Sequence, residues 1–335
     1  MKELKFFRLS LVLAAILLLG LLAGCGSDEE SGDTVTVRVG SLKGPTSLGI
    51  LFLMEKAEYR KTAGEYEFRM AAGAEELLPL MVKGELDIAL VPANVAAILY
   101  EKTKGGVAVV DINTLSVLYL VTGSEQVRSV GDLNGRTIYL TGKGTTPEAV
   151  LRFILHANGL GEEDYHLEFQ SEAAQTAALL AENPQAVGLL PQPFVTAALL
   201  QNETLEAVLD MGKEWTAAQE LMREGTGNPM VTGVTVVRKA FLEEHPEAVE
   251  EFVREHQASA EAILEDPAAG AALAVEAGIL AKEAVAEKAI PECGITCMTG
   301  QEMQDALSAY LEVLAEFDPQ LIGGKLPADD FYFHL

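Results

Sequence analysis

The sequence is poor in cysteine, tryptophan, histidine and basic residues. Three cysteines, one tryptophan and five histidines occur in 335 residues. Lysine and arginine number 24 against 50 aspartates and glutamates, which gives a net charge of −26. This excess of negative charge argues against nucleic acid as a partner and against direct electrostatic docking on anionic lipid. It mainly favours solubility.

The scarce reactive residues do not form a recognisable catalytic or metal-binding pattern. The histidines show neither metal-ligand nor triad spacing. The Gly-Lys-Gly-Thr-Thr of residues 142–146 lacks the spacing of a Walker loop. Cys293 and Cys297 could remain partly buried thiols, or could form a disulfide if Gly294 permits the turn, and both possibilities stay open. A metal site would need further ligands near them, so we expect no metal, no cofactor and no catalytic residue.

The amino-terminal segment has the features of a targeting sequence. After a basic start, residues 9–22 form an uncharged apolar run that is short for a membrane span. The run leads into Leu-Ala-Gly-Cys at residues 22–25, which resembles a bacterial lipobox. We expect residues 1–24 to be a lipoprotein signal peptide, Cys25 to carry the lipid, and residues 25–33 to be a flexible tether. Loss of residues 1–24 removes three bases and one acid, so the net charge becomes −28. The alternative is an uncleaved anchor helix.

A strand, a glycine-rich loop and a helix are expected from Val35 to Met54, with Thr46 or Ser47 as the helix cap. The first turn of a helix leaves backbone N–H groups unpaired and carries partial positive charge, which suits a small polar or anionic ligand. The same order recurs from Thr137 to Leu155. This repetition predicts two similar lobes that face one ligand.

Two lysines, Lys43 and Lys143, occupy matching positions in the two loops. They would either attract an anionic ligand or be ordinary solvated side chains. Strands and helices alternate through both halves of the chain, which favours α/β units with largely parallel sheets. The aromatic residues of the tail at 331–333 are expected to pack back onto the body.

Several blocks together carry a family resemblance. They are the lipobox, GSLKGPTSLG, LMVKGELDIALVPANVAAILYEK, DLNGRTIYLTGKGTTPEAVLRFIL and LPQPFVTAALL. In this order they resemble the nitrate/sulfonate/taurine/thiamine-precursor-like substrate-binding proteins of ABC importers, over essentially the whole mature chain. The resemblance implies a two-lobed type II periplasmic-binding-protein fold of the α/β class. Each lobe would be a mostly parallel sheet flanked by helices, with the ligand at the carboxyl ends of the strands.

Two hinge strands join the lobes in this fold, and we map them to residues 115–122 and 231–237. Lobe one is then 34–118 plus 236–335, and lobe two is 119–235. The resemblance also implies the ligand-binding residues, which match Lys43, Gly44, Pro45, Thr46, Gly73, Asn94, Tyr119, Gly144, Thr145, Thr146, Gln192, Phe194 and Thr232. Trp215, Phe194 or Tyr139 could stack on a ring or could belong to the core.

The function implied by the resemblance is solute capture outside the cytoplasm. The chain would be a lipid-anchored monomer and not an enzyme, and would deliver a small anionic or heterocyclic ligand to an ABC permease with its ATPase. Nitrate needs little room and several donors, sulfonates need donors beside an apolar side, and pyrimidine precursors need aromatics. One alternative is an enzyme of the same fold in menaquinone or thiamine-precursor metabolism. Another is a binding protein that serves a sensor.

Overall fold

A computed structural model describes residues 35–222 and 227–334. Within it, the chain from Thr36 onward forms one compact unit. The expected signal peptide, the tether and the lipidation site at Cys25 lie outside the described residues. In the part of the chain that is described, no helix has both the length and the apolar character needed to cross a membrane.

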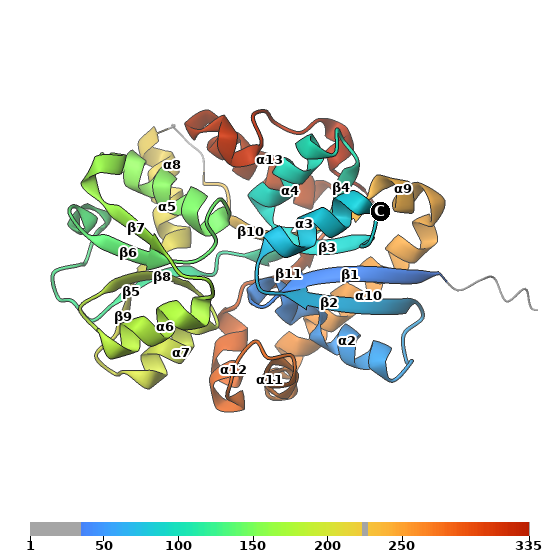
Figure 1. Ribbon diagram of the computed structural model, residues 1–335, viewed down its shortest axis with the longest axis horizontal. Helices are drawn as coiled ribbons and strands as arrows, with labels where there is room; N and C mark the ends of the chain where they lie inside the picture. Colours follow the sequence, from blue (N-terminus) through green and yellow to red (C-terminus); the bar gives the residue numbers. More distant parts are fainter. Residues whose placement is uncertain (1–34, 223–226, 335) are drawn as a thin grey trace, which may run out of the picture. The chain divides into compact units, whose positions relative to one another are not determined.

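The larger of two sheets has six strands. They are β1 (Thr36–Leu42), β2 (Glu65–Ala71), β3 (Ile88–Pro92), β4 (Val107–Leu115), β10 (Val231–Arg238) and β11 (Ile295–Met298). Their order across the sheet is β11-β4-β10-β3-β1-β2. Figure 1 labels each of these strands. The helices that accompany this sheet are α2 (Leu51–Glu58), α3 (Ala74–Lys83), α4 (Ala93–Lys102), α9 (Lys239–Glu244), α10 (Pro246–Glu265), α11 (Pro267–Glu276), α12 (Glu283–Ala289) and α13 (Gly300–Phe317).

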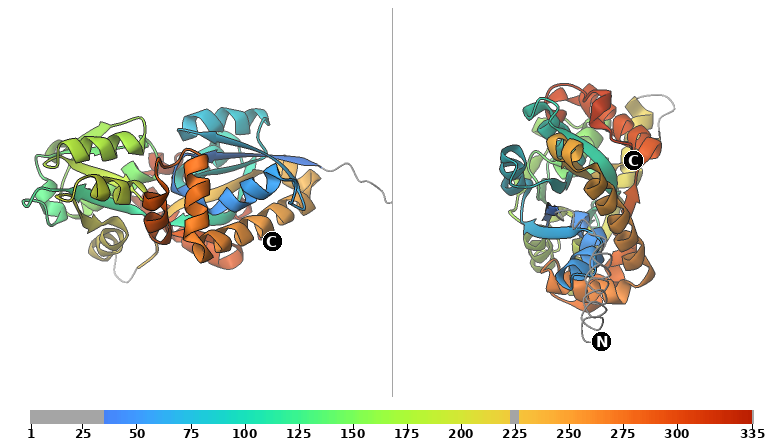
Figure 2. Two further views of the ribbon diagram at one scale, coloured as in Figure 1. Left: turned by 90° about the horizontal axis from the view of Figure 1, so that it is seen from below. Right: turned by 90° about the vertical axis from the view of Figure 1, so that its right-hand side faces the viewer.

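The smaller sheet has five strands. They are β5 (Leu118–Thr122), β6 (Thr137–Leu140), β7 (His166–Phe169), β8 (Val187–Pro191) and β9 (Glu206–Asp210), in the order β7-β6-β8-β5-β9. Its helices are α5 (Thr146–Ala157), α6 (Ala173–Glu182), α7 (Phe194–Gln201) and α8 (Met211–Met222). Short 3₁₀ turns complete the chain: η1 (Pro45–Ile50), η2 (Val130–Leu133), η3 (Glu162–Asp164), η4 (Ile290–Glu292), η5 (Pro319–Ile322) and η6 (Asp329–Phe331). The left view of Figure 2 shows the green part of the chain, which carries the smaller sheet, beside the part that carries the larger sheet.

Pairing within the sheets is more mixed than the sequence suggests. Parallel pairs join β2, β1 and β3 in one sheet and β7, β6 and β8 in the other. The remaining pairs, which involve β10, β11, β5 and β9, are antiparallel. The expectation of mostly parallel sheets therefore holds only for the β-loop-α units that carry the two glycine-rich loops. Relative to the parallel strands of their sheets, β5, β10 and β11 run in the opposite direction, whereas β4 and β9 run in the same direction.

The chain passes between the sheets twice. Residues 115–122, expected as one strand, are divided: β4 ends at Leu115 in the larger sheet, and β5 begins at Leu118 in the smaller sheet. The second passage comes after α8, and the whole of β10 lies in the larger sheet. The predicted lobe boundaries at 118/119 and 235/236 stay a prediction. The strands themselves change sheet at residues 116–117, between β4 and β5, and again before Val231, where β10 begins.

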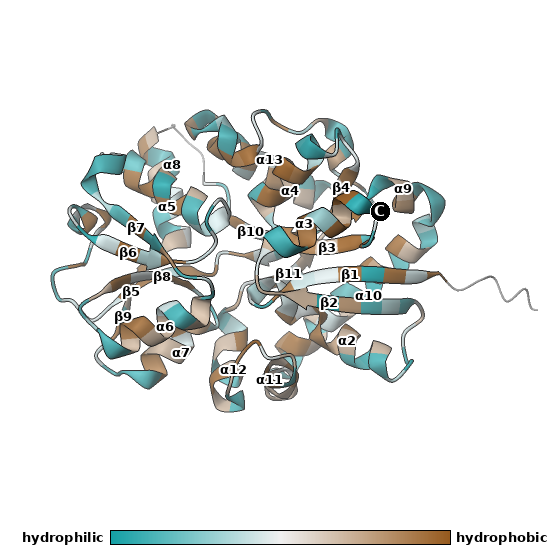
Figure 3. Cartoon of the chain, in the orientation of Figure 1, coloured by the Kyte–Doolittle hydropathy of each residue, from teal (hydrophilic) through white to brown (hydrophobic). Residues whose placement is uncertain are grey.

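The burial of each strand depends on how far helices cover the two faces of its sheet. All but one residue of β3 and of β4 are buried, because helices cover both faces of the larger sheet at its centre. The edge strand β2 alternates between exposed and half-buried residues instead. Hydropathy shows the same contrast between apolar central strands and polar outer helix faces (Figure 3). The predicted packing of the tail is confirmed, because the Phe331 ring lies 5.1 Å from that of Tyr100 and Phe333 N donates to Val109 O.

Candidate functional site

The first glycine-rich loop follows β1 and leads into η1. Lys43 N donates to Ala71 O of the neighbouring strand at 2.9 Å, which anchors the loop at the carboxyl end of the sheet. The turn that follows begins at Pro45, and Ser47 Oγ donates back to Leu42 O. Neither Thr46 nor Ser47 caps a helix through its side chain, so that expectation is wrong. The Ser47 hydroxyl is turned to the preceding strand, and Thr46 Oγ1 is buried without a hydrogen-bond partner among the described residues.

The second loop, residues 141–145, joins β6 to α5 and needs its glycines. Gly142 and Gly144 have φ angles of 76° and 75°, in the left-handed region that side chains rarely adopt. Thr145 Oγ1 donates to Gly142 O at 2.6 Å and closes the turn. Gly144 N donates to Glu148 Oε2 at 2.7 Å, so the helix's own carboxylate occupies one N–H of this loop. Thr145 N donates to Gly142 O at 2.9 Å, so it too is occupied within the loop.

The two loops line one cavity, of about 530 Å³. From the larger sheet come residues 42–46 and the 72–75 turn, and from the smaller sheet residues 141–143, 145–147 and 169–174. Of the residues predicted from the sequence, this cavity brings together Lys43, Gly44, Pro45, Thr46, Gly73, Thr145, Thr146, Phe194 and Thr232. The loops that the sequence marks as equivalent thus face one space, between strands of two different sheets.

Four predicted residues do not line this cavity. Tyr119 comes directly after Leu118 in β5, and Leu118 lines the cavity. Because successive side chains of a strand point to opposite faces, the Tyr119 side chain points away from the cavity. Gln192 Oε1 accepts from Thr196 N and Oγ1 at 3.2 and 2.9 Å, so it is used at the first turn of α7. Asn94 and Gly144 contact each other just beside the cavity instead. Asn94 Nδ2 donates to Gly144 O at 3.0 Å.

Asn94 is a fully buried polar link between the two sheets. Besides Gly144 O, its amide donates to Leu321 O at 3.0 Å. Its Oδ1 accepts from Thr146 Oγ1 at 3.3 Å, and the same hydroxyl lies 3.3 Å from Thr232 O. Asn94 starts α4 beside the larger sheet, whereas Thr146 starts α5 beside the smaller one. These contacts hold the loop before α5 in place.

The turn before α3 offers less free backbone than its sequence implies. The Glu76 carboxylate accepts from Ala72 N at 3.0 Å and from Gly73 N at 3.4 Å. A carboxylate in the first turn of its own helix thus takes the two N–H groups that a ligand could have used. Glu75, the next residue, lines the cavity. Gly73 therefore forms part of the cavity wall, but its backbone N–H is already bonded to Glu76.

The segment between β7 and α6 is part of the cavity wall, although it was not predicted from the sequence as a binding segment. Gln170, Ser171 and residues 172–174 all line the cavity. The signal was present, because residues 166–174 repeat the order of strand, short polar turn and helix seen in the two glycine-rich loops. Ile279 of the larger half also lines the cavity. It lies after α11, where no local pattern marks a binding residue.

Aromatic and charged groups give the cavity two kinds of surface. Phe169 and Phe194 line it, and Lys143 Nζ lies 5.7 Å from the centre of the Phe169 ring. Lys43 enters from the opposite loop. The acids that line it are Glu75 and Glu172. The cavity therefore offers lysines and helix starts beside an apolar, aromatic wall.

Trp215 belongs to the core and not to the cavity. Its side chain is fully buried, its ring centre lies 4.9 Å from that of Phe153 and 5.1 Å from that of Tyr310, and its Nε1 donates to Asn228 O. Phe153 is on α5 and Tyr310 on α13, so this aromatic cluster packs helices of the two sheets together. Of the two interpretations offered by the sequence, the core one is confirmed.

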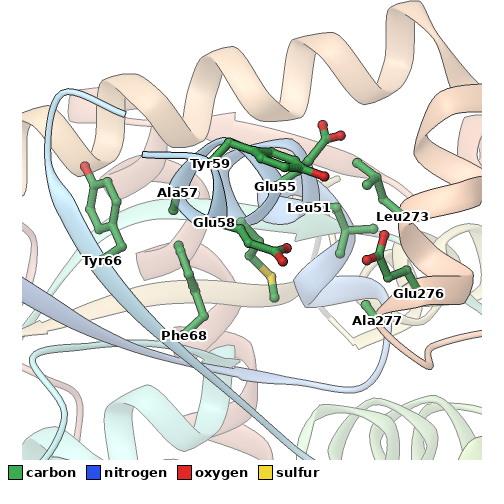
Figure 4. Close-up of a pocket in the computed structure, with 11 residues that line it drawn as sticks. Leu51, Glu55, Ala57, Glu58, Tyr59, Tyr66, Phe68, Leu273, Glu276 and Ala277 are labelled. Atoms are coloured by element: carbon green, nitrogen blue, oxygen red, sulfur yellow. The ribbon is translucent and has the colours of Figure 1, made fainter. Parts of the chain in front are cut away.

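A second cavity, of about 390 Å³, lies elsewhere (Figure 4). Tyr66 and Phe68 of β2, Tyr59 directly after α2 and Leu273 of α11 form its walls. Its carboxylates are those of Glu55, Glu58 and Glu276. None of the residues predicted as a binding site lines it, and its three glutamates would repel an anion.

Comparison with known families gives one match that spans most of the chain. The sequence model of the family described as menaquinone biosynthesis matches residues 48–316. No curated protein matches the chain.

Solved structures share the fold. An ABC transporter from Parabacteroides distasonis is 23% identical with a TM-score of 0.72, and the match covers 90% of this chain and 99% of that chain. The alkanesulfonate-binding protein SsuA from Xanthomonas axonopodis pv. citri, bound to MOPS, is 16% identical (TM-score 0.66, covering 87% and 94%). The periplasmic nitrate-binding protein NrtA from Synechocystis PCC 6803 is 14% identical (TM-score 0.59, covering 89% and 83%). The predicted two-lobed α/β fold is confirmed.

Proposed function

The chain belongs to the family described as menaquinone biosynthesis, and we propose that it acts as the extracytoplasmic solute-binding subunit of an ABC importer. The observation that carries the proposal is the cavity of about 530 Å³ that both glycine-rich loops line. Each loop comes from a different sheet, so a molecule held there touches both halves of the protein. Solved proteins that share the fold are described as an ABC transporter and as alkanesulfonate- and nitrate-binding proteins, which supports this function.

The ligand class follows from the lining. Lys43, Lys143 and the starts of α5 and α6 favour a negatively charged group, and Glu75 and Glu172 on the same lining oppose it. Phe169, Phe194 and Leu118 favour an apolar or aromatic body. A nitrate ion would fill little of about 530 Å³, since one water occupies only about 30 Å³ in the liquid. We therefore expect an organic anion, such as an aromatic carboxylate or a sulfonate with an apolar part.

Capture would use closure of the two halves. Ligand binding drives closure only if the closed arrangement binds more tightly than the open one, so both halves must supply contacts. Asn94 and Thr146 already meet across this boundary. We place the halves at 34–118 plus 236–335 and at 119–235. The remaining predicted residues, Tyr119 and Gln192, would act by shaping strands and turns around the cavity.

Location and partners follow from the sequence. Cys25 would carry a lipid that anchors a monomer to the outer face of the bacterial cell membrane, with residues 25–33 as the tether. The bound ligand would pass to a permease driven by its ATPase. Replacing Cys25 with Ala should abolish metabolic lipid labelling of the chain, and continued labelling would rule out this anchor.

A thermal-shift screen tests the proposed function. Nitrate, alkanesulfonates, aromatic carboxylates, pyrimidines and riboflavin are added separately to the protein without its first 24 residues. A ligand at a hundredfold excess over its dissociation constant stabilises the folded state by about 2.7 kcal/mol. We expect organic anions with an apolar part to raise the melting temperature more than nitrate does. A screen in which no anion stabilises the protein would contradict the proposal.

The family description favours a second candidate, an enzyme of menaquinone biosynthesis. The titratable groups lining the cavity that could take part in chemistry are Lys43, Lys143, Glu75 and Glu172. The two functions differ in what happens to the bound molecule. A stabilising ligand is incubated with a small amount of protein, re-isolated and weighed by mass spectrometry. Recovery of unchanged ligand supports the binding protein, and conversion of many ligand molecules per chain supports the enzyme.

A further inference from the structure

Three possible metal ligands from distant parts of the chain meet beside α10. They are Asp111 on β4, His256 on α10 and Cys297 on β11, and one ligand atom of each lies within 4.8 Å of the others. His256 Nδ1 is 3.1 Å from Asp111 Oδ2 and 3.9 Å from Cys297 Sγ. Asp111 and His256 are fully buried, and Cys297 is half-buried.

The carboxylate of this group is held by an outer layer of hydrogen bonds. Thr235 Oγ1 donates to Asp111 Oδ1 at 2.7 Å, and Asn113 Nδ2 donates to Thr235 Oγ1 at 3.2 Å. Oδ1 is thereby occupied, and Oδ2 is turned to the imidazole. Such outer partners orient ligands and raise their affinity for a metal.

The imidazole is also fixed in orientation. Its Nε2 is buried, has no hydrogen-bond partner among the described residues, and faces Gly49 of η1. A side chain at residue 49 would bring its Cβ within 3.3 Å of this nitrogen. The packing of His256 against the glycine therefore turns Nδ1 toward Asp111 and Cys297.

We propose that Asp111, His256 and Cys297 bind a divalent zinc-type cation. One thiolate, one imidazole and one carboxylate form a ligand set suited to Zn²⁺. Bond lengths of about 2.0–2.3 Å to such ligands place tetrahedral ligand atoms about 3.3–3.6 Å apart. Binding would therefore need Asp111 Oδ2 to move slightly away from His256 Nδ1, now 3.1 Å distant, and Cys297 Sγ to approach it from 3.9 Å. The ligand atoms of Asp111 and Cys297 lie within 4.8 Å of each other. Two negative ligands also neutralise a divalent cation where water is excluded.

This site is separate from the ligand cavity, since none of its three ligands lines that cavity. It lies behind the first glycine-rich loop, because Gly49 is three residues after Thr46 in the same 3₁₀ turn. The proposed site differs from the expectation, drawn from the sequence, that no metal is bound. That expectation rested only on the residues near Cys293 and Cys297 in the chain. The cysteines themselves are free thiols, and Cys293 Sγ donates to Ala289 O away from the group.

Cobalt titration tests the proposal. Metal-free protein, kept reduced, is titrated with Co²⁺ and followed by absorption. We expect saturation near one equivalent, a thiolate-to-cobalt charge-transfer band in the near ultraviolet and intense visible bands of a tetrahedral ion. Zn²⁺ should displace the Co²⁺ and protect one thiol from alkylation.

Two variants and one control locate the site. Cys297→Ser should lose the charge-transfer band, and Thr235→Val, which removes an outer partner, should weaken Co²⁺ binding by about 10–100-fold. Cys293→Ala, which changes the other thiol, should keep both the band and the affinity. Circular dichroism of each metal-free variant checks the fold. If wild-type protein shows no thiolate band, or if Cys297→Ser keeps it, the proposal is wrong, and the group is a buried Asp–His hydrogen bond beside a thiol.

Discussion

Asn94 Nδ2 and Gly144 O lie 3.0 Å apart, and this hydrogen bond connects the first residues of α4 to the loop that begins α5. The two elements accompany different sheets. Because Asn94 is fully buried, the bond is shielded from water, and it marks the place where the two halves are tied beside the cavity.

Replacing Asn94 with Ala should loosen the two halves. The change leaves Gly144 O and Leu321 O without their donor, and a buried group left unpaired costs about 1–3 kcal/mol. We expect a lower free energy of unfolding in urea and a larger radius of gyration in solution X-ray scattering. Asn158→Ala, which removes a bond to Ile154 O within one helix, should leave the radius unchanged. Equal radii for Asn94→Ala and wild type would show that this bond does not hold the halves together.

The two threonine hydroxyls at the cavity should respond in opposite ways. Thr146 Oγ1 is bonded to Asn94 Oδ1 and Thr232 O, whereas Thr46 Oγ1 is buried without a partner among the described residues. Thr146→Val should therefore cost about 1–3 kcal/mol of unfolding free energy, and Thr46→Val should be neutral or slightly stabilising. Urea denaturation of both variants measures the difference. Equal losses would contradict the different environments of the two hydroxyls.

The glycines of the second loop form another matched pair. Both have left-handed φ angles, so Ala at either position should cost about 1 kcal/mol from the backbone alone. A Cβ on Gly142 would also come within 2.3 Å of Thr145 Oγ1, whereas one on Gly144 meets nothing within 4 Å. Thermal unfolding should rank wild type above Gly144→Ala and Gly144→Ala above Gly142→Ala. The reverse order for the two variants would mean that the loop has another conformation.

Asp87 should make stability depend on pH. Its buried carboxylate accepts hydrogen bonds from Arg38 and Arg238 at 2.7–2.8 Å. Burial by itself raises the pKa of Asp87, but these hydrogen bonds outweigh burial and hold the pKa below its ordinary value. The resulting stability is complete above the unfolded-state pKa of about 4 and is lost as pH falls through the lower folded-state value.

Asp87→Asn removes the charged partner of both guanidinium groups. The Arg38 and Arg238 side chains left without their anion are 38% and 22% exposed, so water compensates part of the loss. The free energy of unfolding should therefore fall by about 1.5–3 kcal/mol at pH 7. The variant should also lose less stability than wild type between pH 5 and about 2. Urea denaturation across this range measures both effects, with Asp305→Asn on the exposed face of α13 as the control. Parallel pH curves for wild type and Asp87→Asn would contradict the assignment.

The sequence predicts the α/β plan and the two facing loops because both depend on local patterns. Apolar strands, glycines and helix starts recur at short spacing, and equivalent loops meet at the carboxyl ends of their sheets. Local pattern does not show which backbone donors are already occupied. Glu76 takes those of Ala72 and Gly73, and Glu148 takes that of Gly144. Nor does it bring together Asp111, His256 and Cys297, whose proximity depends on packing between β4, α10 and β11.

The proposed function depends on an organic anion that binds between the two glycine-rich loops. The direct test is isothermal titration calorimetry with the best ligand of the thermal-shift screen. Three proteins are compared: wild type, a Lys43→Ala/Lys143→Ala cavity variant, and a Lys102→Ala/Lys288→Ala control of equal charge. All four lysines are exposed, and only the first two line the cavity. We expect the dissociation constant to rise at least about tenfold, or 1.4 kcal/mol, in the cavity variant and to stay unchanged in the control. An unchanged constant in the cavity variant, or equal weakening in both, would contradict the proposed function.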